Sequence, residues 1–133
     1  MADVFTLQSY QINDWWPHIE PFLSRVERPD WTPEGVRAEL EQSMAQFWGM
    51  ADDSRLLAVW ITKVQETSRG KRGLLWIAAG SELHDGLALF RLHTEPWLKA
   101  QGCRSIQILG RKGWQRVLPD YDDVGIVLEK VLQ

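Results

Sequence analysis

The chain has 133 residues, which suits one domain and leaves little room for a second. Its net charge of −3 gives no overall electrostatic support to nucleic-acid binding, and no apolar run is long enough to span a bilayer. The single cysteine excludes an internal disulfide and a multi-cysteine zinc site. The N-terminus lacks the pattern of a signal peptide, so we expect a cytoplasmic protein without a membrane partner.

One strand and two helices are expected first. A short apolar run at 4–7 predicts the strand. Apolar residues then recur at three- and four-residue steps as far as Val26, which predicts a helix capped by Asn13 or Asp14. Thr32, which a proline follows, is typical of the start of a second helix.

Three strands are expected in the middle of the chain. Phe47–Met50 and Leu56–Val64, joined by a short polar turn, predict an antiparallel hairpin in which one face of the second strand packs only partly. The basic segment Glu66–Gly73 is expected to be a loop. Leu74–Ala79 contains no polar residue, which predicts a central strand covered on both faces.

The C-terminal part predicts a long helix at Leu87–Gln101, a strand at Cys103–Leu109, a short helix at Lys112–Leu118 and a final strand at Ile126–Leu132. The long helix joins two strands, and such a βαβ unit makes them parallel, whereas the earlier strands should be antiparallel. We therefore expect one mixed α/β (α+β) domain over 1–133 with about four helices, in the order β-α-α-β-β-β-α-β-α-β.

This order of elements resembles the GCN5-related N-acetyltransferase (GNAT) superfamily over nearly the whole chain, and Glu95–Cys103 (EPWLKAQGC) resembles the end of its central helix. Gly110–Leu118 (GRKGWQRVL) resembles more specifically a group of bacteriophage-encoded members. The resemblance implies a centrally splayed sheet whose gap holds acyl-CoA. It also implies a loop that wraps the pyrophosphate with backbone N–H groups at a helix N-terminus.

Two segments are candidates for cofactor binding. The resemblance places one at the loop before the central helix, with Ala79, Gly80, Ser81, Asp85, Gly86 and Leu87. The second is the strand-to-helix junction with Gly110, Arg111, Lys112 and Trp114, where two cations beside free N–H groups favour an anion. The alternative for the second segment is that the arginine pairs with surface carboxylates and the tryptophan belongs to the core.

The first segment departs from the superfamily pattern. That pattern is Gln or Arg, two residues, Gly, one residue, then Gly or Ala; here the leading residue is absent and the glycine spacing differs. Glu82 and Asp85 stand where the doubly charged pyrophosphate would lie, and Asp85 can itself cap the helix. We therefore describe this loop as degenerate.

The sequence does not determine the catalytic residues. Many members of the superfamily protonate the leaving thiolate with a tyrosine on the helix after the second splayed strand, but Leu118 aligns there. Tyr121 could substitute only if its loop folds back. Glu66 and His84 are candidate bases, although each also fits a solvated surface group. No histidine has a partner at metal-binding spacing, so no metal is expected.

The favoured function is that of a phage-encoded GNAT-fold protein with a degenerate acyl-CoA loop. It would need no cofactor and would act as a binding or virion-associated protein in the host cytoplasm or the particle. The alternative is an active N-acyltransferase using acetyl-CoA or another acyl-CoA. Nucleic-acid binding is least favoured; it would use Arg69, Lys71, Arg72, Arg111, Lys112 and Arg116.

Overall fold

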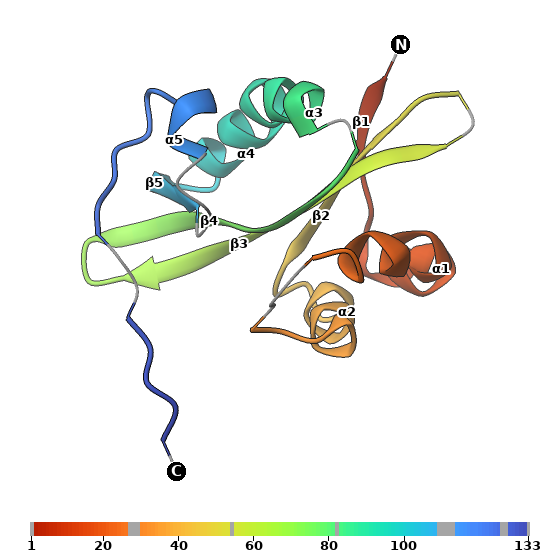
Figure 1. Cartoon of the computed structure of the whole chain (residues 1–133), viewed down its shortest axis with the longest axis horizontal. Coiled ribbons are helices and arrows are strands. Elements are labelled where there is room, and N and C mark those ends of the chain that lie inside the picture. The colour runs from red at the N-terminus through yellow and green to blue at the C-terminus, as the bar shows by residue number, and fades with distance from the viewer. Residues whose placement is uncertain are drawn as a thin grey trace.

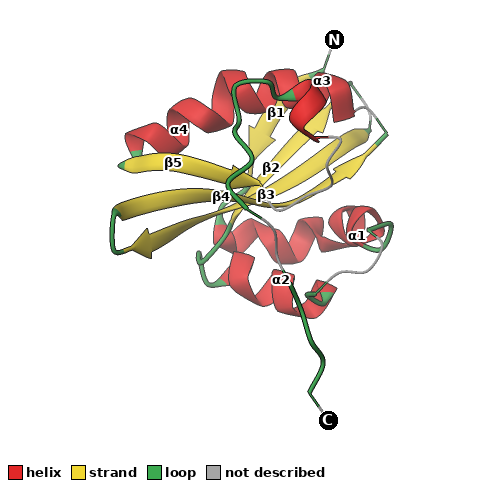
Figure 2. Ribbon diagram, turned by 60° about the vertical axis from the view of Figure 1, so that its left-hand side comes forward, coloured by secondary structure: helices red, strands yellow, loops and turns green. Residues whose placement is uncertain are grey.

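A five-stranded sheet with helices on both faces forms the body of the computed structural model (Figures 1 and 2). The structure describes residues 2–26, 30–53, 55–81, 83–108, 114–125 and 128–132. None of the helices in these ranges is long and apolar enough to cross a bilayer.

The strands lie side by side in chain order. They are β1 (Asp3–Thr6), β2 (Gln46–Ala51), β3 (Leu56–Thr67), β4 (Gly70–Gly80) and β5 (Cys103–Ile108). The first three pairings are antiparallel and the β4–β5 pairing is parallel. This confirms the predicted mixed sheet, with the apolar strand between two neighbours.

The helices divide between the two faces of the sheet. α1 and α2 cover one face, and α3 and α4 cover the other (Figure 2). A π-helical turn, η2, joins α3 to α4, and the short α5 follows β5. The helical segments are η1 (Ser9–Gln11, a 3-10 turn), α1 (Ile12–Leu23), α2 (Pro33–Glu41), α3 (Leu83–Leu89), η2 (Phe90–Thr94), α4 (Glu95–Ala100) and α5 (Trp114–Val117).

Each face of the sheet carries its own apolar core. Val59, Ile61 and Ile77 face the core beneath α1 and α2. Ala58 and Trp60 face the core beneath the α3–α4 helix. These alternating β3 residues are all nearly inaccessible, whereas Leu57 and Lys63 are half-buried. Both faces of β3 therefore pack fully in the middle of the strand, and the face of Val59 and Ile61 packs only partly at Leu57 and Lys63.

The first two helices begin differently. Neither Asn13 nor Asp14 caps α1, because the η1 turn starts the helical path earlier and Gln8 and Gln11 cap that turn reciprocally. The second prediction is confirmed, since the Thr32 hydroxyl accepts a hydrogen bond of 3.0 Å from the Gly35 N–H at the start of α2.

The segment predicted as a basic loop is the end of a β-hairpin. β3 extends to Thr67 and β4 begins at Gly70, so only two residues make the turn. The Thr67 hydroxyl accepts a hydrogen bond from the Arg69 N–H and donates one to the Gly70 carbonyl, and Gly70 has a φ of +109°. The polar composition of this segment predicted a loop, but its residues continue the pairing of β3 with β4 in a hairpin end that reaches solvent.

The long helix starts at Leu83, earlier than predicted, and the π-helical turn interrupts it just before Pro96. A proline has no N–H and clashes with the preceding turn of a regular α-helix, and the wider turn accommodates it. Gly102, with a φ of +93°, follows the helix end as predicted.

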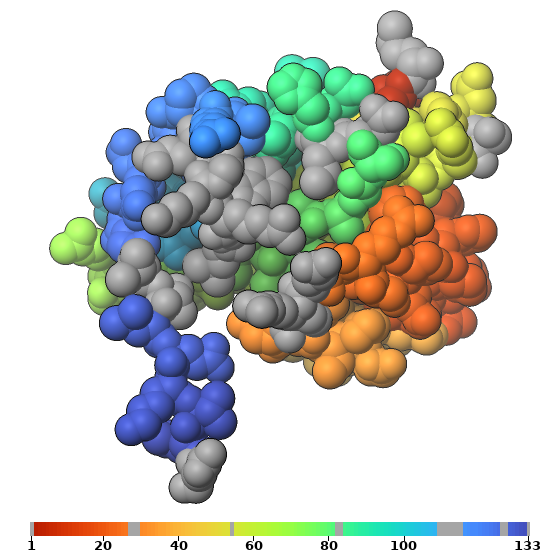
Figure 3. Space-filling model, viewed as in Figure 1, coloured from red at the N-terminus to blue at the C-terminus, as the bar shows by residue number. Residues whose placement is uncertain are grey.

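The final predicted strand is absent from the described part of its range. Residues 128–132 pair with no strand and project from the body (Figures 1 and 3). Leu128 is 85% exposed and Leu132 is 84% exposed. Apolar residues alone do not make a strand, which also needs a neighbouring edge with which to pair. The short helix predicted at Lys112–Leu118 is confirmed in part, since α5 covers Trp114–Val117.

Candidate functional site

β4 and β5 pair along only part of their length. Parallel partners run from Lys71 with Cys103 to Leu75 with Ile108, and β4 then continues to Gly80. β5 ends at Ile108, and residues 109–113 lie outside the description, so only β4 is described beyond this pairing. Open α/β sheets bind ligands at the carboxyl ends of such parallel strands.

A β-bulge lies in β4 just beyond its last described pair with β5. Ile61 of β3 faces Ile77, but its neighbour Thr62 faces Leu75, so Trp76 is the extra residue of β4. A bulge bends its strand and increases the local twist. The Lys63 ammonium lies 3.6 Å from the centre of the Trp76 ring and fixes that side chain.

The end of β4 lies tightly against β3. Gly80 has a φ of +148°, and a Cβ atom there would lie 2.6 Å from both the Ala58 Cα and the Leu57 oxygen. The N–H of Ser81 donates a 3.3 Å hydrogen bond to the same Leu57 carbonyl. Ala79 is buried. These three predicted cofactor residues are consecutive in the chain, and the Ser81 N–H is already used within the protein.

The remaining residues of that loop lie on the first turns of α3. His84 and Asp85 are exposed, Leu87 is half-buried, and Gly86 is buried against Trp60. Asp85 is not the helix cap that the sequence predicted, because the helix begins at Leu83 and places this carboxylate in the first turn. There it interacts favourably with the positive end of the helix dipole.

The second predicted anion segment is largely outside the described residues. Gly110, Arg111 and Lys112 lie in the undescribed range, and although Trp114 begins α5, its side chain is also outside the description. The anion site expected at this junction stays a prediction.

Tyr121 folds back onto the helix layer, the condition that the sequence set for it. Its hydroxyl donates a 2.7 Å hydrogen bond to the Glu95 carboxylate, and its ring packs on the core beneath α3 and α4. Asp120, the residue before Tyr121, forms an ion pair with Arg91 of η2 and so ties this segment to the helix layer. Burial first, and then the bond to Glu95, raise the pKa of the Tyr121 phenol well above its ordinary value.

The two candidate bases lie far apart. Glu66 is exposed near the hairpin turn, opposite Lys71, whereas His84 follows the other end of β4. At about 3.3 Å per residue, the length of β4 separates them by roughly 30 Å, so they cannot serve one site. Within the described residues, no three His, Cys, Asp or Glu side chains are grouped to hold a metal ion.

Sequence reasoning missed two buried hydroxyl groups. The Trp60 indole N–H donates a 2.9 Å hydrogen bond to the Thr94 hydroxyl, and the Trp48 indole donates a 3.0 Å bond to Thr62. Both threonines are fully buried. The signal for Thr94 was a hydroxyl residue within an apolar helical stripe, and its structural role is to satisfy a core tryptophan.

A mixed sheet in which a long helix connects the parallel strands β4 and β5 is the arrangement expected of the GNAT fold. No protein-family model and no curated protein matches the sequence. Among solved structures, a GCN5-related N-acetyltransferase from Ralstonia eutropha JMP134 has a TM-score of 0.74 at 14% identity, covering 98% of this chain and 99% of that chain.

Two further structures support the same fold. An aminoglycoside acetyltransferase from an uncultured soil metagenomic sample, in complex with trehalose, has a TM-score of 0.73 at 10% identity and covers 99% of this chain and 97% of its own. A predicted acetyltransferase from Clostridium acetobutylicum, solved with acetyl-CoA, has a TM-score of 0.67 at 13% identity, with coverages of 98% and 96%. The expected GNAT fold is thus confirmed.

Proposed function

We propose that this chain is a GNAT-fold binding protein in which acetyl transfer has been lost. The observation that carries the proposal is the segment that leads into α3, whose first turn holds a carboxylate and so does not fit a pyrophosphate. The Ser81 N–H is bonded to Leu57, and the Asp85 carboxylate lies in the first turn. A carboxylate close to a phosphate costs on the order of 1 kcal/mol at a surface, and more when buried.

The proton-donating position also supports this proposal. The side chain of Leu118, which aligns with the tyrosine of many acetyltransferases, is 1% exposed and carries no proton to donate. Tyr121 is near, but its hydroxyl already donates to Glu95 and its pKa is raised. A general acid works best with a pKa near the operating pH, so a phenol held this way is poorly suited.

A binding role is further supported by the C-terminal segment. Val124, Leu128, Val131 and Leu132 are each at least 77% exposed, although all four are apolar. Exposed apolar side chains of this kind favour ordering against another protein. Together with the phage resemblance of Gly110–Leu118, this leads us to place the partner among the proteins of a bacteriophage particle or an infected cell.

Calorimetric titration with acetyl-CoA tests the lost site. We expect no saturable heat at about 1 mM ligand, and tight binding by the wild-type chain would contradict the proposal. Asp85→Asn should strengthen residual binding by several-fold, because it removes the repelled charge. Asp14→Asn is the matched control, since Asp14 is also an exposed acid in a first helical turn, on the other face of the sheet.

Mass spectrometry of purified phage particles tests the partner. We expect the chain in the particles, or in a stable complex with a particle protein from infected cells. A strictly monomeric protein confined to the host cytosol would contradict this part of the proposal.

A second candidate function is acyl transfer to an amine, favoured by the GNAT-like arrangement of the parallel strands β4 and β5. Bound acyl-CoA would supply the activated acyl group, and Tyr121 is the proton donor nearest in sequence to the expected position. Release of free thiol from acetyl-CoA in the presence of a panel of amines distinguishes the candidates. Thiol release that Tyr121→Phe lowers would support the enzyme, and its absence would support the binding protein.

A further inference from the structure

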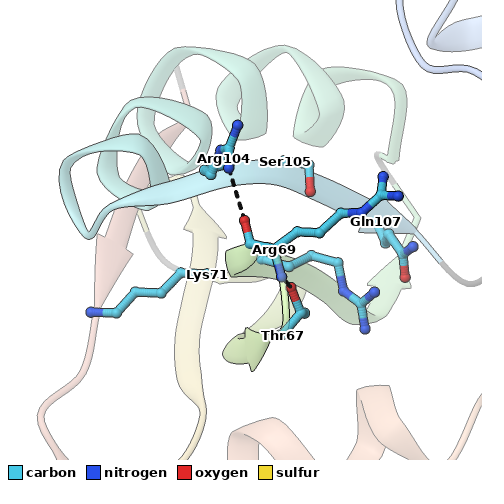
Figure 4. A pocket seen from close by; sticks show the side chains of 7 residues that line it. Thr67, Arg69, Lys71, Arg104, Ser105 and Gln107 are labelled. Atoms are coloured by element: carbon cyan, nitrogen blue, oxygen red, sulfur yellow. Dashed lines mark hydrogen bonds between the residues drawn. The ribbon is translucent and has the colours of Figure 1, made fainter.

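A basic hollow of about 500 Å³ lies at the hairpin end of β4, away from the start of α3 (Figure 4). The β3–β4 hairpin lines it with Thr67, Arg69 and Arg72, and β5 lines it with Arg104, Ser105 and Gln107. Lys71 is at its edge, and its side chain extends away from the others. The lining therefore combines several cations with neutral hydrogen-bonding groups.

Strand register explains why these side chains gather. Arg72 is the pairing partner of Ser105, and Leu74 is that of Gln107, so both β5 residues lie on the face that Arg72 shares. Ile106 and Ile108 alternate with them and pack on the core beneath α3 and α4. The hollow is consequently on the opposite face from the α3–α4 helix, and roughly 25 Å of β4 separates it from the start of α3.

The positive charge in the hollow is uncompensated. No carboxylate is among the lining residues, and none of the ion pairs of the described residues involves Arg69, Arg72 or Arg104. The chain as a whole has a net charge of −3, so this concentration of cations runs against its overall balance. A hollow lined by one sign of charge attracts ions of the opposite sign.

Arg72 provides an independent sign of a missing acceptor. One terminal nitrogen, Nη2, donates a 3.0 Å hydrogen bond to Gln65, but the Nε–H is buried and has no acceptor in the described part of the chain. Arg104 in turn donates a 3.0 Å bond to the Arg69 carbonyl and ties the hairpin turn to β5. Buried donors are nearly always satisfied, and oxyanions are the acceptors that guanidinium groups prefer.

We propose that this hollow binds the di- or triphosphate group of a small molecule. Several arginines suit a ligand with more than one negative charge, and the Ser105 hydroxyl and the Gln107 amide provide further donors. The volume is that of a small-molecule site. The inference is independent of the proposed function, because the hollow lies away from α3 and on the other face of the sheet.

Titration with inorganic tripolyphosphate at low salt, followed by NMR of the backbone amides, tests the proposal. We expect saturable shifts at the hairpin turn and along β5. Arg69→Gln and Arg72→Gln should each weaken binding by about tenfold. Arg55→Gln is the matched control, because Arg55 is an exposed arginine of the β2–β3 hairpin at the far end of the sheet (Figure 1), and it should leave the affinity unchanged.

Several outcomes would overturn the proposal. They are no saturable binding up to about 10 mM tripolyphosphate, an equal loss in the Arg55 variant, or equally tight binding of citrate. A short single-stranded DNA that binds more tightly, with a steep dependence on salt, would assign the hollow to nucleic acid instead. Arg69 is exposed on a turn, so its variant remains informative if Arg72→Gln unfolds the chain. Tripolyphosphate carries no acyl group, so a failure of the hollow to bind it does not bear on the test of acetyl-CoA binding.

Discussion

Replacing Gly80 by alanine should destabilise the fold strongly. Two effects add. A φ of +148° strains any residue with a Cβ atom, by about 1–2 kcal/mol. The new methyl group would also lie 2.6 Å from backbone atoms of Leu57 and Ala58, which cannot move without shifting β3; such overpacking costs about 1–3 kcal/mol. The sum of about 2–5 kcal/mol is a large fraction of the stability of a typical domain.

Gly125→Ala is the matched control for this prediction. Gly125 has a φ of +147°, but a Cβ atom there would meet nothing within 4 Å. This variant therefore has only the backbone strain, which an exposed segment can partly relax, and it should cost about 1 kcal/mol or less.

Thermal and urea unfolding, followed by circular dichroism, measure both variants. Gly80→Ala should lower Tm by about 10 °C, and Gly125→Ala by no more than a few degrees. Equal losses in the two variants would refute the reasoning, because they would mean that the close approach of β4 to β3 has no energetic consequence.

Two other predictions concern buried polar groups. Thr94→Val should cost about 1–3 kcal/mol, because it leaves the buried Trp60 indole N–H without an acceptor, whereas Thr6→Val on an exposed strand position should change the unfolding free energy little. In a variant in which the other tyrosine, Tyr10, is replaced by phenylalanine, only Tyr121 can give a phenolate absorbance. We expect Tyr121 to remain protonated in the folded protein as the pH rises. Because its folded pKa is raised, its contribution to stability is complete below about pH 10 and is lost above that value, and a phenolate signal from intact protein near pH 10 would contradict this.

The site was only partly predictable from sequence. Glycine and acid positions located the loop before the long helix, where Ala79, Gly80 and Ser81 follow one another along the chain. The sequence could not reveal that the Ser81 N–H is used by β3, or that Glu66 lies opposite the start of β4 while His84 follows its end. These contacts depend on the register between strands. The residue pattern of one strand does not determine which residues of the next strand it faces.

The sequence by itself determined several of the elements and how they connect. The apolar run at 74–79 specified a strand covered on both faces, Thr32 specified a helix start, and the long helix between two strands made them parallel. These features depend on periodicity and local hydrogen bonding, which neighbouring residues settle.

Only the tertiary structure decided where β4 bulges and where charge gathers. The bulge at Trp76 arises from pairing with β3, and the contact between Arg104 and Arg69 joins residues 35 positions apart. The C-terminal apolar residues made no strand in the described range 128–132, because a strand forms only where a partner edge meets it. Contacts between distant segments are selected by the packing of the whole fold, and no local pattern contains them.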